Sequence, residues 1–100
     1  HMTNHLLALI AAHFACSDIS ETRQMTWPEI HMCNAVYEDI KLEFVPGMDR
    51  ATYRSLSSAD KVAVNRQGFE AFHDWRVKNP GMVTLLENVA KGEAQLGFAL

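Results

Sequence analysis

The sequence predicts an all-α fold, a compact bundle of about four main helices plus one short helix. Residues 57–78 carry the clearest helix pattern, because Ser57 and Asp60 are placed to cap a helix that begins just after Ser57. Asn79-Pro80-Gly81 then forms a strong stop. Apart from the short Leu42–Phe44 alternation, which lies inside a helical pattern, no alternating run bounded by turns predicts a strand.

The chain of 100 residues is expected to form one domain, with His1-Met2 as a cloning remnant ahead of a native start at Met2. Its 48% hydrophobic residues supply material for a core, and its three prolines and five glycines are too few for a disordered chain. A domain of this size buries only a modest share of its surface, so we expect a homodimer as readily as a monomer.

The first helix is expected over about residues 5–16, with Thr3 or Asn4 as its cap. The Ser17-Asp18-Ile19-Ser20 run interrupts the apolar pattern and supplies capping side chains, so residues 17–24 are expected to form a loop or one short turn.

A second helix is expected to begin after Thr26, with Pro28 in its first turn and Glu29 at the positive end of the helix dipole. Pro46-Gly47 should end it. Its apolar residues follow spacings of 3, 4, 3 and 4, which is typical of a helix packed against an antiparallel neighbour. These residues are Ile30, Cys33, Tyr37, Ile40 and Phe44.

Asp49 can cap a short helix that runs through Leu56, and the helix that follows Ser57 should reach Lys78. The apolar residues of this long helix cover about half of its circumference, so we expect two or more neighbours to pack against it. A last helix is expected from Met82 to Gly92, and the tail from Glu93 to Leu100 could either dock or serve a partner. The predicted shared core consists of Ile30, Tyr37, Ile40, Phe44, Val62, Phe69, Phe72 and Leu86.

The net charge of −3 and the isoelectric point near 5.9 disfavour a protein whose main task is to neutralise phosphates. Nucleic acid is therefore not the expected partner. Six bases nevertheless lie between Arg50 and Lys78, so a helix-turn-helix formed by residues 49–78 is the alternative. The residues that would contact DNA in that case are Arg50, Arg54, Lys61, Arg66 and Gln67.

Cys16 and Cys33 both lie in apolar helical patterns, and we expect two free thiols in a cytoplasmic protein. Leu6 to Ala15 is too short to span a bilayer and lacks the basic flank of a secretory signal. His13 and Cys16 share a helix face, but the second pair of ligands that a structural zinc site needs is missing. We therefore expect no metal, no cofactor and no membrane segment.

The sequence contains no G-x-S-x-G elbow and no glycine-rich phosphate loop, so we do not expect an enzyme. The candidate partner-binding residues lie near the end of the long helix: Phe72, His73, Trp75 and Arg76. Arg76 falls inside the apolar arc, so it must pair with an acid, extend past Phe72 to water, or border an interface. Aromatic residues and arginine are enriched at binding hot spots.

These observations together predict a small, non-catalytic regulator or inhibitor that acts by binding another protein. Small helical domains of this kind are frequent among accessory proteins of phages and other mobile elements, an association of size and fold class alone.

Overall fold

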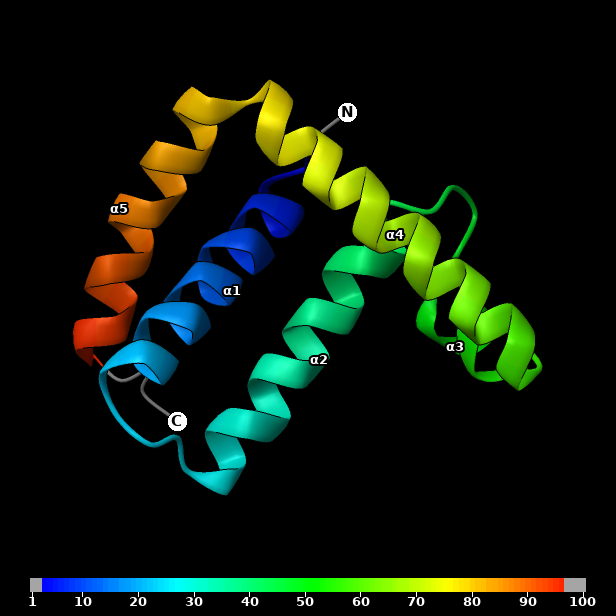
Figure 1. Cartoon of the computed structure of the whole chain (residues 1–100), viewed down its shortest axis with the longest axis horizontal. Helices are drawn as coiled ribbons and strands as arrows, with labels where there is room; N and C mark the ends of the chain where they lie inside the picture. The colour runs from blue at the N-terminus through cyan, green and yellow to red at the C-terminus, as the bar shows by residue number, and fades with distance from the viewer. Residues whose placement is uncertain (1–2, 97–100) are drawn as a thin grey trace.

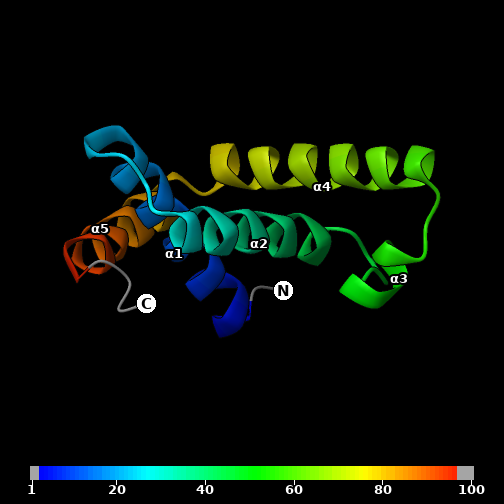
Figure 2. The ribbon, with the colours of Figure 1, turned by 90° about the horizontal axis from the view of Figure 1, so that it is seen from below.

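The computed structural model describes residues 3–96, which form helices and no strand. The helices are α1 (Asn4–Thr22), α2 (Trp27–Glu43), α3 (Arg50–Arg54), α4 (Ser58–Lys78) and α5 (Pro80–Leu96). Figure 1 shows α1 between α5 and α2, and α1 packs against both. α4 crosses α2 as an outer layer, as Figure 2 shows from below, and the short α3 lies beside the start of α4. The predicted all-α fold is confirmed.

Four helices begin at the predicted capping residues. The side chain of Thr3 accepts a hydrogen bond from the backbone N–H of Leu6 at the start of α1. Thr26 and Glu29 form a reciprocal capping box at the start of α2. Asp49 caps α3 and Ser57 caps α4. These local signals fix where most of the helices begin.

α1 continues through the segment that was predicted to be a loop. The hydroxyl groups that were expected to break the helix donate instead to helix carbonyl oxygens: Ser17 to His13 at 3.3 Å, Ser20 to Ser17 at 2.8 Å, and Thr22 to Ile19 at 3.1 Å. Ile19 is buried, and the burial of its side chain stabilises the extra turns of the helix. The prediction was wrong here, and the chain leaves the helix only after Thr22.

α5 also extends beyond its predicted end, because Gly92 lies inside the helix. Glycine in a helix costs only about 1 kcal/mol relative to alanine. Ala94 packs against the core beyond this position, and that contact favours continuation. The remainder of the predicted tail, residues 97–100, lies outside the described residues.

The core lies where α1 meets α2, α4 and α5. Ile40, Phe72 and Leu86 are buried as predicted, while Tyr37 and Phe44 are half-buried and pack against them. Ile30 is also half-buried. Most of the remaining core comes from α1 and consists of Leu6, Ile10, Ala11, Phe14 and Ala15.

The core prediction is wrong for two residues, because Val62 is 59% exposed and Phe69 is 51% exposed. α4 contacts α2, α3 and α5, but all of its shielded residues recur on one face of the helix, along which Gly68 and Phe72 are buried. The two or more neighbours that were expected are therefore present, but they cover less of the circumference than the apolar arc does. The apolar arc of α4 is wider than its contact face, and the outer part meets solvent.

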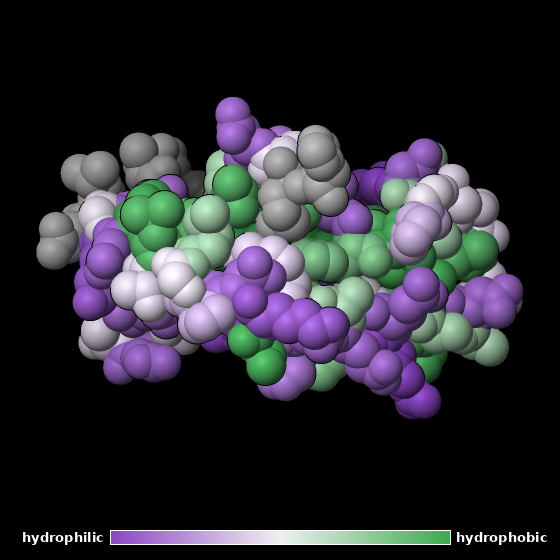
Figure 3. Space-filling model, turned by 90° about the horizontal axis from the view of Figure 1, so that it is seen from above, coloured by the Kyte–Doolittle hydropathy of each residue, from purple (hydrophilic) through white to green (hydrophobic). Residues whose placement is uncertain are grey.

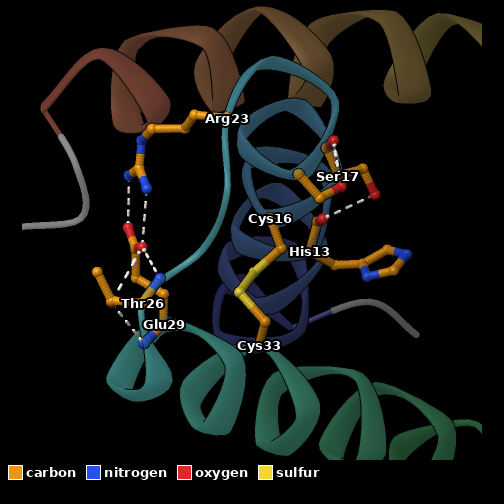
Figure 4. The surroundings of a disulfide bond; sticks show 8 residues. His13, Cys16, Ser17, Arg23, Thr26, Glu29 and Cys33 are labelled. Carbon is orange, nitrogen blue, oxygen red and sulfur yellow. Dashed lines mark hydrogen bonds and ion pairs between the residues drawn. A yellow bond between two sulfur atoms is a disulfide. The ribbon is translucent and has the colours of Figure 1, made fainter.

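Cys16 and Cys33 form a disulfide that joins α1 to α2, with 5.9 Å between their Cα atoms (Figure 4). The prediction of free thiols is therefore wrong. Each thiol lies on the helix face that packs against the other helix, so the antiparallel packing of α1 and α2 brings them together. Disulfides persist mainly in oxidising compartments, so the cytoplasmic expectation loses the observation on which it rested.

Beside this disulfide, an ion pair joins the two ends of the loop between α1 and α2 (Figure 4). The guanidinium of Arg23 donates to both carboxylate oxygens of the buried Glu29, at 2.9 and 2.6 Å. These bonds, with the backbone N–H of Thr26, lower the pKa of Glu29 to about 2.

Among residues 3–96, no helix is both long enough and apolar enough to cross a bilayer.

Candidate protein-binding site

The structure divides the four predicted partner-binding residues between two sides of α4. Phe72 is 3% exposed and belongs to the core, and Trp75 is half-buried and packs against that core. His73 and Arg76 are exposed. A single hot spot formed by all four side chains is therefore excluded, because a partner cannot reach Phe72 while the domain is folded.

Arg76 lies over an aromatic surface. Its guanidinium carbon is 4.9 Å from the centre of the Phe14 ring and 5.8 Å from the centre of the Phe72 ring. Such contacts hold a cation in place without using its N–H donors. Within residues 3–96, no carboxylate lies within ion-pair distance of Arg76. The sequence left three alternatives for Arg76: an ion pair with an acid, extension past Phe72 to water, or a position bordering an interface. The geometry does not provide the first of these, the ion pair.

Arg76 and Thr84 join two neighbouring hollows on the surface. The first, the corner hollow, has a volume of about 500 Å³ and lies where α4 turns into α5; it is lined by His73, Arg76, Val77, Pro80, Val83 and Thr84. The second, the α1–α5 groove, has a volume of about 480 Å³; its lining includes Phe14, Asp18, Glu21, Arg76, Thr84, Glu87 and Lys91. A ligand that spans both must pass Arg76.

The two hollows differ in chemistry. The corner hollow is lined by the apolar side chains of Val77, Pro80 and Val83. The α1–α5 groove carries carboxylates from both of its helices, at Asp18 and Glu87 among others, and the groove therefore favours a polar ligand. Together they suit an extended surface with apolar and charged parts, which is more typical of a protein than of a small metabolite.

His13 packs among the aromatic rings near Arg76. Its ring stacks on Tyr37 with 4.7 Å between ring centres and meets Phe72 edge-on at 5.7 Å. Burial, and then the positive charge of Arg76, lower the pKa of His13 to about 4. At neutral pH the imidazole is therefore uncharged, and it does not repel the guanidinium.

The predicted DNA-contacting residues are differently engaged. Arg50 pairs with Asp39 of α2 and lies 3.8 Å from Glu38, so its charge is directed toward the domain itself. Lys61 lies over the Tyr53 ring, with 5.9 Å between its Nζ and the ring centre. Arg54 is exposed on α3. Arg66 and Gln67 line a shallow hollow on the flank of α4, together with Glu70 and Asp74.

Sequence reasoning missed several large apolar side chains that are exposed. Trp27 is 74% exposed at the start of α2, and Val77 is 66% exposed on α4. Figure 3 shows hydrophobic side chains reaching the surface at both ends of the molecule. One signal could have revealed the outer face of α4. Gly68 marks the side on which another backbone approaches closely, and Val62, Phe69 and Val77 lie roughly 100° or more around the helix from it.

Within residues 3–96, no three side chains from His, Cys, Asp and Glu come together as a metal site would require. No protein-family model, no curated protein and no solved structure matches the chain.

Proposed function

We propose that this protein is a non-catalytic regulator or inhibitor that binds another protein at the surface around Arg76. The observation that supports the proposal is the state of Arg76 itself. Its guanidinium is positioned over Phe14 and Phe72, yet within the described residues it has no carboxylate partner. A positioned arginine with free donors loses little conformational entropy when it binds a carboxylate.

The surroundings of Arg76 supply the remaining contacts. An apolar side chain of the partner would enter the corner hollow beside Val77 and Pro80. Polar side chains would lie along the α1–α5 groove, where Lys91 and Glu87 offer charges of both signs. His73 borders the corner hollow and would contact the partner, whereas Phe72 and Trp75 would act by supporting Arg76 and α4.

The test is affinity purification from the native host with the wild-type chain and with Arg76→Ala. Lys78→Ala is the matched control, because Lys78 is an exposed base two residues away whose charge is paired with Asp74. We expect a protein that is retained by the wild type and by Lys78→Ala but lost with Arg76→Ala. If every retained protein binds all three chains equally, Arg76 is not the binding residue.

DNA binding through residues 49–78 is the alternative, and it predicts tight binding to duplex DNA that weakens steeply with salt. The pairing of Arg50 with Asp39 and Glu38 counts against it, because a base that contacts phosphate must leave those carboxylates. A salt titration against random duplex DNA distinguishes the two functions.

A further inference from the structure

The outer face of α4 carries a row of side chains that no other part of the described structure covers. Val62, Phe69 and Val77 are 59%, 51% and 66% exposed, and they follow one another at spacings of seven and eight residues. Arg66 and His73 lie between them at helical spacing, and the ring of His73 stacks on that of Phe69. These five residues, the outer α4 face, lie on the side of α4 away from α2. Figure 2 shows no other helix beyond α4 on this side.

The order of residues along this face is nearly the same in both directions. Phe69 lies at its centre, and Val62 and Val77 lie seven and eight residues away at its two ends. When two copies of such a helix pack antiparallel about a two-fold axis near Phe69, each Val62 meets Val77 of the other copy and the two Phe69 rings meet at the centre. This apolar row extends over roughly 22 Å, which is about four helical turns.

The charges beside the row are complementary under the same two-fold operation. Arg66 precedes the centre of the face, and Glu70 and Asp74 follow it. In an antiparallel pair, Arg66 of one copy therefore lies beside Glu70 and Asp74 of the other, and the contact occurs twice. Arg66 and Glu70 lie one helical turn apart, but within residues 3–96 no ion pair joins them.

We propose that the outer α4 face binds a second copy of this chain, forming an antiparallel two-fold homodimer centred on Phe69. A two-fold pair uses the same patch on both copies, and only an antiparallel arrangement places the valines opposite each other and the bases opposite the acids. This interface shares His73 and Val77 with the corner hollow, but Arg76 and the groove between α1 and α5 remain outside it. The homodimer is argued from other observations than the function proposed for Arg76.

The first experiment measures the mass of the full chain in solution by sedimentation equilibrium. We expect twice the monomer mass of 11.3 kDa at high protein concentration. Phe69→Glu should raise the dissociation constant at least roughly tenfold, because it places two carboxylates at the centre of the interface. Leu85→Glu is the matched control, because Leu85 is 55% exposed on α5, outside the outer α4 face. A wild-type monomer, or a dimer that survives Phe69→Glu, overturns the proposal.

The second experiment tests the pairing itself. Arg66→Glu and Glu70→Arg should each weaken the dimer, and the double variant should restore it, because the pair is then reversed in both copies. An equal mixture of Val62→Cys and Val77→Cys chains should cross-link on oxidation, whereas Val62→Cys alone should not. Cross-linking of Val62→Cys with itself would show a parallel arrangement and overturn the proposed pairing. Arg76→Ala should remain dimeric, so loss of partner binding and loss of dimerisation can be told apart.

Discussion

The backbone of Lys41 lies directly against Gly68, where α2 and α4 cross. A Cβ atom added to Gly68 would lie 2.8 Å from the carbonyl carbon of Lys41 and 2.9 Å from its Cα atom. Protein interiors are packed too tightly to absorb such an approach without moving one of the helices. The absence of a side chain at Gly68 therefore sets the spacing of α2 and α4, and with it the position of Phe72 and Arg76.

Gly68→Ala should lower the free energy of unfolding by roughly 1–3 kcal/mol, the range usual for overpacking. The effect should appear in urea denaturation even though alanine favours a helix over glycine by about 1 kcal/mol. Gly92→Ala is the matched control, because a Cβ atom at Gly92 would meet nothing within 4 Å. That variant should be stabilised slightly. A stabilised Gly68→Ala variant would show that α2 and α4 do not cross at this point.

Phe72→Ala should lower the free energy of unfolding by roughly 3–5 kcal/mol, because it leaves a cavity in the core. At a protein concentration low enough to keep the chain monomeric, Phe69→Ala should lower it by less than about 1 kcal/mol, because Phe69 is 51% exposed and does not belong to the buried cluster. This reverses the expectation from the helical wheel, which placed both rings in one core. Parallel urea titrations of the two variants decide the question, and an equal loss in both would mean that Phe69 is buried after all.

The sequence predicted what is local in this fold. Capping by Thr26, Asp49 and Ser57 depends on residues within one turn, and all three caps are present. A break after Lys78 also separates α4 from α5 as expected, although it consists of Asn79 alone and α5 begins at Pro80 instead of Met82. Residues that depend on tertiary contact were predicted less well. Whether a serine run ends α1 is decided by the burial of Ile19, which no local pattern reveals.

The exposure of the candidate site residues was predicted in part for the same reason, and their role in binding stays a prediction. His73 and Arg76 were identified as residue types that bind, and both are exposed. Phe72 was assigned with them because a helical wheel gives angles and not neighbours, and its ring is buried. The disulfide was missed because pairing requires two helices to be placed against each other, and each cysteine alone looks like an ordinary core residue.

Reduction of the Cys16–Cys33 disulfide should destabilise the protein. The bond joins residues 17 positions apart, and closing a loop of this length is worth about 3 kcal/mol in the chain-entropy account. We expect a clear fall in melting temperature when reductant is added, in contrast to the indifference expected of free thiols. Chelator should leave it unchanged.

The control for this measurement is a variant with both cysteines replaced by alanine. It should melt close to the reduced wild type and should not respond to reductant. If the wild type were equally indifferent, the two thiols would not be bonded in solution.

His13 should make the protein less stable in mildly acidic solution. The pKa of its imidazole is lowered from 6.5 to about 4 in the folded protein, first by burial and then by the charge of Arg76. As the pH falls below 6.5, the unfolded chain binds a proton at His13 while the folded protein does not. The stability from this group is therefore complete above pH 6.5 and is lost as the pH falls from 6.5 to about 4.

Melting curves between pH 7 and pH 4 should reveal this loss, and His13→Phe should reduce it, because phenylalanine keeps a ring on Tyr37 but cannot bind a proton. His5→Phe is the control, because His5 is exposed and lies outside both proposed binding surfaces, and it should follow the wild type. Glu29 acts mainly at lower pH, since its pKa is lowered from 4.5 to about 2 and its contribution to stability is lost over that range.

Arg76→Ala should also raise the pKa of His13, which nuclear magnetic resonance of the imidazole can measure directly. An unchanged pKa of His13 in Arg76→Ala would mean that Arg76 and His13 are not neighbours in solution. An unchanged acid response in His13→Phe would mean that His13 does not cause the loss of stability.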